Sequence, residues 1–288
     1  FLEHAPRLEM VARMQISSDN TDMEACAQRR IRVLQARSAT VRSNAEYLLY
    51  GLLMLYRRGM ISALLGRQIS QVRMGRELAG STVGLLGLAP VAHTLAPMLK
   101  GLGVRLLGYD PAVHHAAPIW AKLGVEPVPL NELLERSDAV SLQVVYASRF
   151  RGWINERLLN HCKPGQLWVG VSRSSLFDPE ALALALTDGR IDACLLDGAN
   201  PAFAAEGTPL YNVPNLHLTP RLGSHTREAK LRASWYVAHR IHETLSPHAV
   251  GHDGGASDFT VLDSLEYHEP EDPQAVTPSQ WGSIAMHR

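Results

Sequence analysis

Short apolar runs and amphipathic stretches alternate along the middle of the chain. The apolar runs predict strands at 81–88, 104–109, 139–145, 166–171, 193–196 and 216–219. The amphipathic stretches between them predict helices at 90–102, 131–136, 154–160 and 179–187. On the first of these helices, one predicted face carries Val91, Leu95, Met98, Leu99 and Leu102. Alternating strands and helices predict an α/β fold, with a doubly wound parallel sheet covered by helices on both sides.

Two further elements are predicted before this region. The segment 8–14 resembles a short strand, and 46–58 carries apolar residues on more than one face, which is typical of a helix buried on several sides. The chain has 288 residues, of which 46% are hydrophobic and 19% charged, so it is long enough for two domains and can bury a core. No apolar run approaches the roughly 18–20 residues that cross a bilayer.

The charges cancel, with 28 basic and 28 acidic residues, so composition does not indicate a nucleic-acid partner. Three cysteines, far apart and odd in number, argue against a disulfide framework or a metal site. We therefore expect a soluble, cytoplasmic protein. The balance is uneven along the chain: residues 27–76 contain ten arginines and one acid, whereas 252–288 contain seven acids and one arginine. We interpret these as a solvated face and an irregular terminus; the alternative is that they meet across an interface.

A glycine turn between the first strand and its helix carries the most specific signal. Gly87 follows the strand, Ala92 stands at the third position of a dinucleotide-binding fingerprint, and Asp110 ends the next strand. Such a turn presents backbone N–H groups and a helix N-terminus to a pyrophosphate. The acid accepts hydrogen bonds from ribose hydroxyls and disfavours a 2′-phosphate, which predicts NAD rather than NADP.

The fingerprint departs from its usual form at Ala89, which replaces the second glycine. That glycine normally lets the backbone approach the pyrophosphate, so we expect Ala89 to weaken NAD binding. Pro90 and Val91, in the first turn of the helix, complete the predicted cofactor-binding segment. A strand–turn–helix of a doubly wound fold without a cofactor has the same pattern, and this alternative stays open.

Ordered matches over some 240 residues identify a family. They lie at 19–22, 45–46, 78–87, 109–111, 130–141, 163–165, 172–173, 178–182, 189–191, 196–197 and 214–220. From Leu2 to about Ile241 the chain resembles the D-isomer-specific 2-hydroxyacid dehydrogenases, which include phosphoglycerate, glycerate, formate and D-lactate dehydrogenases and the corepressors called C-terminal binding proteins.

The resemblance implies two doubly wound domains with the active site between them. It assigns 1–42 to the remainder of a flavodoxin-like substrate domain that begins before Phe1, and 43–223 to the dinucleotide-binding domain. Residues 224–288 then hold the helix that returns to the substrate domain and an irregular acidic tail. The family usually forms homodimers through the long helix that here begins at Ala45.

The resemblance also implies hydride transfer between nicotinamide and a 2-hydroxy or 2-keto acid. Arg173 matches the arginine that holds the substrate carboxylate, and Ser172 and Asp197 match cofactor-site positions. Arg221 stands where the family has its acid–base histidine, and Ala202 stands where it has the glutamate that orients this histidine. The substrate-contacting glycines are also altered, to 15–17 (Gln-Ile-Ser).

These replacements change the predicted chemistry. A guanidinium has no acceptor and stays protonated, so Arg221 cannot serve as a general base. His225, four residues on, is a candidate surrogate, although a histidine at the start of the following helix is the simpler interpretation. Arg173 and Arg221 together suit a small dicarboxylate or phosphorylated ligand; alternatively, Arg221 pairs with a neighbouring acid. Two functions remain: an NAD-dependent oxidoreductase with an impaired site, or a non-catalytic dimeric relative that binds or regulates.

Overall fold

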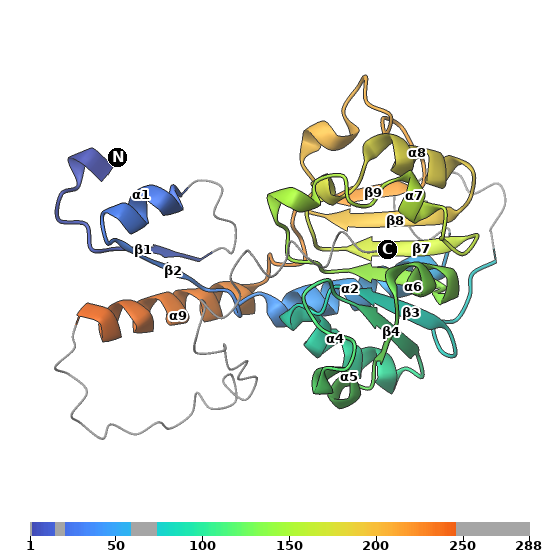
Figure 1. Ribbon diagram of the computed structural model, residues 1–288, viewed down its shortest axis with the longest axis horizontal. Coiled ribbons are helices and arrows are strands. Elements are labelled where there is room, and N and C mark those ends of the chain that lie inside the picture. The colour runs from blue at the N-terminus through green and yellow to red at the C-terminus, as the bar shows by residue number, and fades with distance from the viewer. Residues whose placement is uncertain (1, 15–20, 59–73, 246–288) are drawn as a thin grey trace. The chain divides into compact units, whose positions relative to one another are not determined.

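The structure, a computed structural model, describes residues 2–14, 21–58 and 74–245. Its main feature is a sheet of seven parallel strands in the order β5-β4-β3-β6-β7-β8-β9 (Figure 1). The strands are β3 (Thr82–Leu86), β4 (Arg105–Tyr109), β5 (Glu126–Pro127), β6 (Ala139–Leu142), β7 (Gln166–Gly170), β8 (Ile191–Asp197) and β9 (Leu216–Thr219). The strand order reverses between β3 and β6, which is where open α/β sheets bind ligands. This sheet confirms the predicted fold class.

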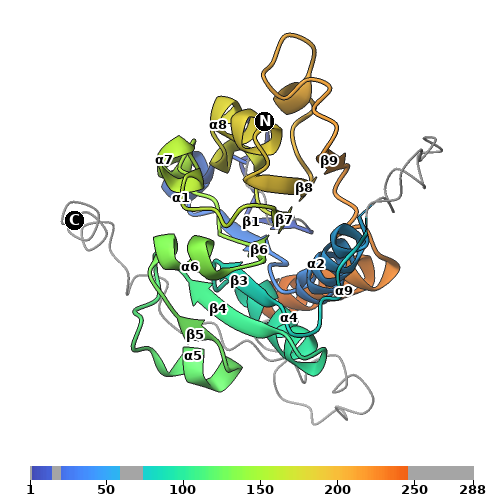
Figure 2. The same ribbon diagram turned by 90° about the vertical axis from the view of Figure 1, so that its right-hand side faces the viewer.

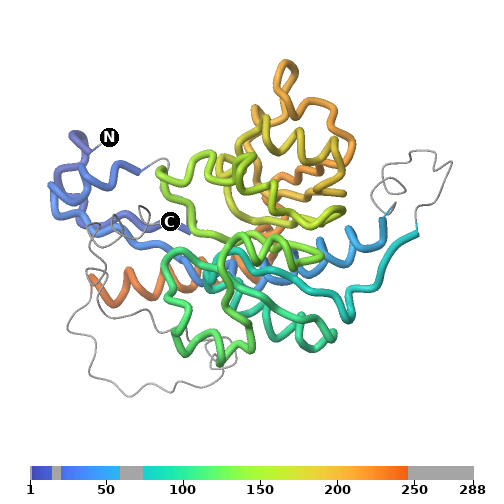
Figure 3. Tube along the Cα trace, turned by 45° about the vertical axis from the view of Figure 1, so that its right-hand side comes forward, coloured from blue at the N-terminus to red at the C-terminus, as the bar shows by residue number. Residues whose placement is uncertain are grey.

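Helices cover both sides of the sheet (Figure 2). One side is packed by α2 (Val41–Tyr56), α4 (Pro90–Gly101) and α5 (Pro118–Leu123), and the other by α6 (Leu130–Arg136), α7 (Glu156–Leu159) and α8 (Pro179–Thr187). The central strands read as nearly continuous apolar runs because both of their faces are buried: Val83 and Leu85 pack in one core, and Leu86 in the other. Figure 3 follows the alternation of strand and helix from the cyan of β3 to the orange of β9.

A second, two-stranded parallel sheet is formed near the start of the chain. It contains β1 (Met10–Arg13) and β2 (Arg32–Gln35), and the 3₁₀ helix η1 (Leu2–His4) and helix α1 (Met23–Gln28) precede each of these strands in turn. The long helix α9 (Arg227–Leu245) buries Ala233 against Ala36 and Ala39, and its Arg232 Nε donates to the Ala39 carbonyl oxygen at 3.0 Å. Whether these segments form the separate domain assigned from the sequence stays a prediction.

Several predicted boundaries shift. The helix expected from Ala45 or Glu46 begins at Val41, and the strand expected at 139–145 ends at Leu142. The helix expected at 154–160 shortens to α7 because the Asn155 side chain caps it, accepting from the Leu158 N–H at 3.2 Å. Leu102, predicted on the buried face, is 42% exposed. The short elements α5 and β5 were not predicted. Residues 15–17 and the acidic tail at 252–288 lie outside the described residues.

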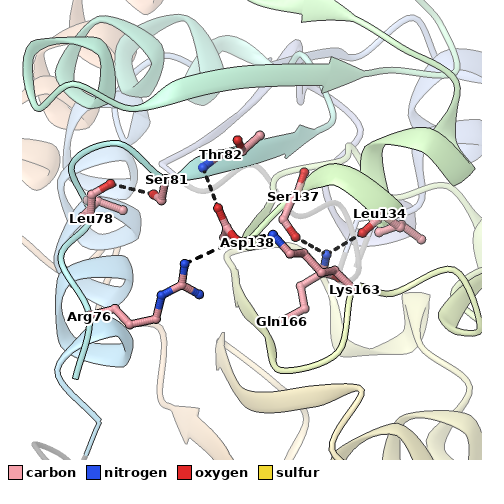
Figure 4. A network of polar contacts seen from close by, with 9 residues as sticks. All are labelled: Arg76, Leu78, Ser81, Thr82, Leu134, Ser137, Asp138, Lys163 and Gln166. Atoms are coloured by element: carbon pink, nitrogen blue, oxygen red, sulfur yellow. Dashed lines mark hydrogen bonds and ion pairs between the residues drawn. The ribbon is translucent and has the colours of Figure 1, made fainter. Parts of the chain in front are cut away.

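The edge at which the strands begin, called the amino edge here, is held by a buried carboxylate that pairs with two partly exposed cations (Figure 4). The Asp138 carboxylate, 8% exposed, accepts from the Thr82 N–H at 2.9 Å and from Lys163 Nζ at 2.6 Å. The Arg76 guanidinium lies 3.5 Å from the same carboxylate. Burial alone would raise the pKa of Asp138, but the hydrogen bonds from Lys163 and Thr82 and the positive charges of Lys163 and Arg76 together lower it below its usual range.

A buried glutamine completes this edge. Gln166 Nε2 donates to the carbonyl oxygens of Leu134 and Ser137, both at 2.7 Å (Figure 4). Gln166 Oε1 accepts from Trp168 Nε1 at 3.0 Å. These bonds join the start of β7 to the end of α6, so the amide is bonded on both sides within the core.

Candidate cofactor and substrate site

The predicted glycine turn lies at the opposite edge, where the strands end, called the carboxyl edge here. Gly87 follows β3 with φ +101°, a left-handed conformation that favours glycine. A Cβ on Gly87 would stand 2.6 Å from the Val144 backbone nitrogen, so the turn has no room for a side chain. The Gly87 N–H donates to the Tyr109 carbonyl oxygen at 2.8 Å, which ties the turn to β4. Gly87 is therefore required both for its backbone angle and for space.

Ala89 occupies the N-cap position of α4 with φ −59° and ψ 161°, and Pro90 is the first helical residue. This φ is an ordinary one for alanine, so the chain adopts the turn without a second glycine. No side chain caps the helix at this end, and the Ala92 N–H bonds back to the Ala89 carbonyl oxygen at 2.7 Å. Ala89 and Pro90 are partly exposed, and Val91 follows them in the first turn. The backbone conformation of the turn therefore does not require a glycine at position 89, and a weakening of NAD binding by the Ala89 methyl stays a prediction.

Asp110 lies beside this turn at the end of β4. Its Oδ2 accepts from the Leu88 N–H at 2.5 Å, and its Oδ1 accepts from the Ala112 N–H at 2.7 Å. Each carboxylate oxygen has a second lone pair, so these bonds leave acceptor capacity for ribose hydroxyls. The Gly87 turn and the Asp110 carboxylate are the groups that contact NAD in a dinucleotide-binding fold, and both fit that cofactor.

His93, on the first turns of α4, also touches the glycine turn. Its ring hydrogen-bonds the Leu88 backbone, and burial lowers its pKa below the usual range against the effect of that bond. The sequence analysis did not single out His93. A polar residue one turn into the helix of a dinucleotide fingerprint is the only signal that points to it.

Asp197, at the end of β8, holds the loop that carries Arg221. Its carboxylate accepts from Thr219 Oγ1 at 2.6 Å, from the Leu222 N–H at 2.7 Å and from the Gly223 N–H at 2.9 Å. The Tyr47 hydroxyl lies 2.6 Å from Thr219 Oγ1. Burial raises the pKa of Tyr47 to about 12, with the Asp197 charge adding to it and the Thr219 bond opposing it. Four hydrogen bonds thus tie this loop to the end of β8 and to α2.

Arg221 itself has φ +58°, and its N–H bonds the Thr219 carbonyl oxygen at 3.0 Å. The aliphatic part of its side chain lies over Gly198, where a Cβ would stand 2.8 Å from Arg221 Cγ. Within residues 2–14, 21–58 and 74–245, no carboxylate lies at ion-pairing distance from the Arg221 guanidinium. Pairing with a neighbouring acid, the alternative raised from the sequence, therefore finds no support in the described part of the chain.

Ala202 and His225 lie in the two loops around this position. Ala202 is exposed in the 3₁₀ helix η4 (Pro201–Ala204), and its N–H bonds Asn200 Oδ1 at 3.0 Å. His225 is exposed just before α9, with its N–H on the Leu222 carbonyl oxygen at 3.1 Å. Neither contact decides whether His225 moves protons in the site, and this stays a prediction.

Arg173 follows β7 at the same edge of the sheet. Its guanidinium carbon lies 5.0 Å from the centroid of the Tyr146 ring, within cation–π distance. The adjacent Ser172 is buried, and its hydroxyl donates to the Val144 carbonyl oxygen at 2.8 Å. Ser172 therefore anchors the end of β6, a contact that spacing in the sequence does not reveal. Arg173 and Arg221 follow strands separated by β8, and their convergence on one ligand stays a prediction.

The described residues also bear on three other features: metal ligands, apolar helices and disulfides. Among the described residues, no group of three or more His, Cys, Asp or Glu side chains is arranged to hold a metal ion. No described helix is both long and apolar enough to cross a bilayer. The three cysteines are free and buried.

Comparison with known proteins places this geometry in a family. Residues 53–223 match the model of the D-isomer specific 2-hydroxyacid dehydrogenase NAD-binding domain. The chain is 33% identical over 252 residues to (S)-sulfolactate dehydrogenase from Chromohalobacter salexigens, covering 86% of this chain and 81% of that protein. It is 34% identical over 275 residues to D-3-phosphoglycerate dehydrogenase from Mycobacterium tuberculosis, covering 92% of this chain and about half, 51%, of that protein.

Solved structures show the same fold. The NAD complex of formate dehydrogenase from Staphylococcus aureus superposes with a TM-score of 0.71 at 24% identity, covering 85% of this chain and 74% of that one. Holo D-mandelate dehydrogenase from Rhodotorula graminis gives a TM-score of 0.74 at 24% identity, covering 83% and 72%. The chain belongs to the D-isomer-specific 2-hydroxyacid dehydrogenases, a family of oxidoreductases, and contains their NAD-binding domain.

Proposed function

We propose that this protein binds NAD at the Gly87 turn and that its hydride transfer is impaired at position 221. The proposal rests on a contrast between two loops at the carboxyl edge of the sheet. The turn and Asp110 are arranged as a dinucleotide needs, whereas the loop fixed by Asp197 presents a guanidinium. Bound NAD would supply the hydride chemistry. Gly87 and the start of α4 would face its pyrophosphate, and Asp110 would accept from its ribose hydroxyls.

The impaired step is proton transfer at the substrate hydroxyl. Arg221 has five donors and no acceptor, so it holds a substrate oxygen or carboxylate but removes no proton from it. Ala202 has no group with which to orient or tune a base. The loss of a general acid–base group typically lowers a rate by about 10²–10⁴. We therefore expect slow turnover of 2-keto acids, with His225 as the candidate surrogate for the missing acid–base group.

Arg173 is the proposed carboxylate-binding residue. With Arg221 it would offer two guanidiniums to a small dicarboxylate or a phosphorylated acid, through bidentate contacts. The relatives named above act on sulfolactate and 3-phosphoglycerate according to their names, and both of those acids carry a second anionic group. A ligand with two anionic groups is therefore the substrate class we propose.

A second function rests on the same observation. With no base at position 221, the protein can be a non-catalytic relative that binds NAD and an anion as a dimeric regulatory scaffold. We propose a homodimer because the exposed face of α2 carries Tyr50 and Leu53, which are 54% and 41% exposed. We also propose a cytoplasmic location, in keeping with three free cysteines.

One titration separates the two functions. NADH fluorescence is followed as protein is added, and then NADH oxidation is followed at 340 nm after addition of glyoxylate, hydroxypyruvate or 3-phosphohydroxypyruvate. The catalytic function predicts an NADH Kd below about 100 μM together with oxidation. The scaffold function predicts the same binding without oxidation. Failure to bind NADH at millimolar concentration would contradict both.

A further inference from the structure

Gln143, the residue that follows β6, contacts the glycine turn. The Gln143 side chain is 3% exposed, and its Nε2 donates to the Gly87 carbonyl oxygen at 2.8 Å. Its Oε1 accepts from the buried Ser141 hydroxyl at 2.8 Å. Because the Gly87 carbonyl oxygen only accepts, the amide nitrogen must face it, and the Ser141 hydroxyl then donates to the amide oxygen and holds the amide in this orientation.

This contact matters because the turn lacks the hydrogen bonds of a regular element. Gly87 at φ +101° lies between β3 and α4, and contacts with neighbouring segments hold it. The Asp110 carboxylate binds the Leu88 N–H, and the Val144 backbone lies where a Gly87 side chain would be. Gln143 takes the Gly87 carbonyl oxygen, the acceptor that would otherwise be buried without a defined partner.

We propose that Gln143 is a positioning residue for the dinucleotide turn. By holding the Gly87 carbonyl oxygen toward β6, it orients the Ala89 N–H and the start of α4 toward the pyrophosphate, while the Leu88 N–H stays on Asp110. The proposal rests on the proposed NAD binding, which it deepens. Only one of the two usual turn glycines is present. In this proposal the buried Gln143 side chain orients the turn, in place of the backbone freedom that the second glycine would provide.

The segment that carries Gln143 also contacts the part of the chain that carries Arg173. Val144, next to Gln143, accepts from the Ser172 hydroxyl at 2.8 Å, and Ser172 directly precedes Arg173. The segment 143–144 therefore contacts both the turn that would receive the pyrophosphate and the chain that carries the carboxylate-binding arginine. Loss of the Gln143 amide is expected to disturb cofactor binding first, because that bond ends on Gly87 itself.

The chain offers a matched control in Gln166. This glutamine is 1% exposed and donates two bonds to carbonyl oxygens while accepting one, but it lies at the amino edge (Figure 4). Gln166→Leu and Gln143→Leu each leave buried polar groups without partners and are expected to lower the thermal midpoint by similar amounts. Only one of them touches the turn.

The experiment measures NADH binding, thermal unfolding and amide exchange of the segment 86–93 in the wild type, Gln143→Leu, Gln143→Glu and Gln166→Leu. We expect NADH binding to weaken about tenfold in both Gln143 variants, since neither a leucine nor a carboxylate donates to Gly87, and to change less than about twofold in Gln166→Leu. Amide exchange at 86–93 is expected to accelerate only in the Gln143 variants. Should these fail to fold, Ser141→Ala, which removes the bond that orients the amide, is expected to give the same change at about threefold.

Two outcomes would overturn the proposal. One is an equal change in NADH affinity for the Gln143 and Gln166 variants, which would show a general loss of stability. The other is unchanged affinity and unchanged exchange in the Gln143 variants. If the wild type binds no NADH, the proposed function fails by itself; faster exchange at 86–93 confined to the Gln143 variants would still support the positioning role.

Discussion

The two edges of the seven-stranded sheet use carboxylates in different ways. At the amino edge, Asp138 is neutralised by the Lys163 ammonium and the Arg76 guanidinium (Figure 4). At the carboxyl edge, Asp110 and Asp197 accept from backbone N–H groups and a hydroxyl, and the structure describes no cation at ion-pairing distance from either. A carboxylate that is paired with cations has its charge neutralised within the protein. One that is bonded only to neutral donors keeps its charge, and it can order loops and accept hydrogen bonds from a ligand.

Five of the glycines with positive φ differ in the same direction, whereas Gly124, before β5, has the end of the Lys100 side chain at its Cβ position. Gly80, Gly165 and Gly189, before the strands, have no atom within 4 Å of the place where a Cβ would be. Gly87 and Gly198, after the strands, would bring that Cβ to 2.6 Å and 2.8 Å from neighbouring atoms. The first group is needed only for backbone angles, and the second also for close packing around the loops of the site. The comparison teaches that the amino edge is built for stability and the carboxyl edge for precise loop placement.

The largest effect is expected from restoring the acid–base pair at the carboxyl edge. Arg221→His with Ala202→Glu should raise NADH-dependent reduction of 2-keto acids by about 10²–10⁴ if only those groups are missing. Histidine adopts the φ +58° of position 221 more readily than most residues. Turnover is measured by NADH oxidation.

A control variant and the NADH binding of the histidine variant decide how the turnover is interpreted. Arg221→Gln with Ala202→Glu serves as the control, because glutamine supplies no acid or base, and it should show no gain. Binding of NADH without turnover in the histidine variant would place a further defect in the substrate site. Absence of NADH binding in that variant would make the Ala89 turn the primary defect.

The next effect tests close packing after the strands. Gly87→Ala puts a methyl 2.6 Å from the Val144 nitrogen at a left-handed φ, and we expect a loss of about 3 kcal/mol in the free energy of unfolding. NADH affinity should fall by more than tenfold. The matched variant Gly80→Ala, at φ +74° with open space, should cost only about 1 kcal/mol, as measured by urea unfolding. Equal losses for the two variants would remove the distinction between the edges.

A third prediction concerns the ion pairs of the amino edge. Asp138→Asn should lower the free energy of unfolding by about 1–3 kcal/mol, because Lys163 and Arg76 lose their shared partner. The pKa of Asp138 is depressed in the folded state, so its contribution is present above the unfolded pKa and is lost as pH falls through the folded pKa. The variant should therefore lose less stability than the wild type below about pH 4. NADH affinity should not change, and a weaker affinity would mean that the two edges are coupled.

The smallest effect is expected at Tyr47, which supports the loop of Arg221. Tyr47→Phe removes the hydroxyl on Thr219 and should cost about 1 kcal/mol. The folded pKa of Tyr47 is raised to about 12, so its contribution is fully present below the unfolded pKa and is lost as pH rises through the folded value. Urea unfolding between pH 9 and about 11 should show a shallower alkaline loss in the variant. Tyr211→Phe, at an exposed tyrosine that does not act on Tyr47, is the control and should leave the curve unchanged.

Much of the fold follows from local patterns. The run from Thr82 to Leu86 and the helix from Pro90 are recognisable because each buries its apolar residues with the period of its element. The short β5 was missed because two residues carry no period, and α5 because six residues barely complete a turn and a half. The start of α2 was placed too late, since its first turn is polar and its burial comes only from packing.

The site was predicted unevenly for a related reason. Gly87 and Asp110 stand at fixed spacings around one strand and helix, so the sequence alone points to them. The roles of Gln143, Tyr146 and Ser172 depend on which strands lie next to each other. Spacing along the chain does not report those neighbours.

The sequence by itself determined the alternation of strands and helices, the family, and the chemical limits of Arg221 and Ala202, because these depend on periodicity and on residue type. Tertiary structure alone decided that Asp197 holds the loop of position 221, that Asp138 forms ion pairs with two cations, and that Gln143 binds the Gly87 carbonyl oxygen. Such contacts join residues far apart in the chain, and the strand order that brings them together is set by packing of the whole sheet.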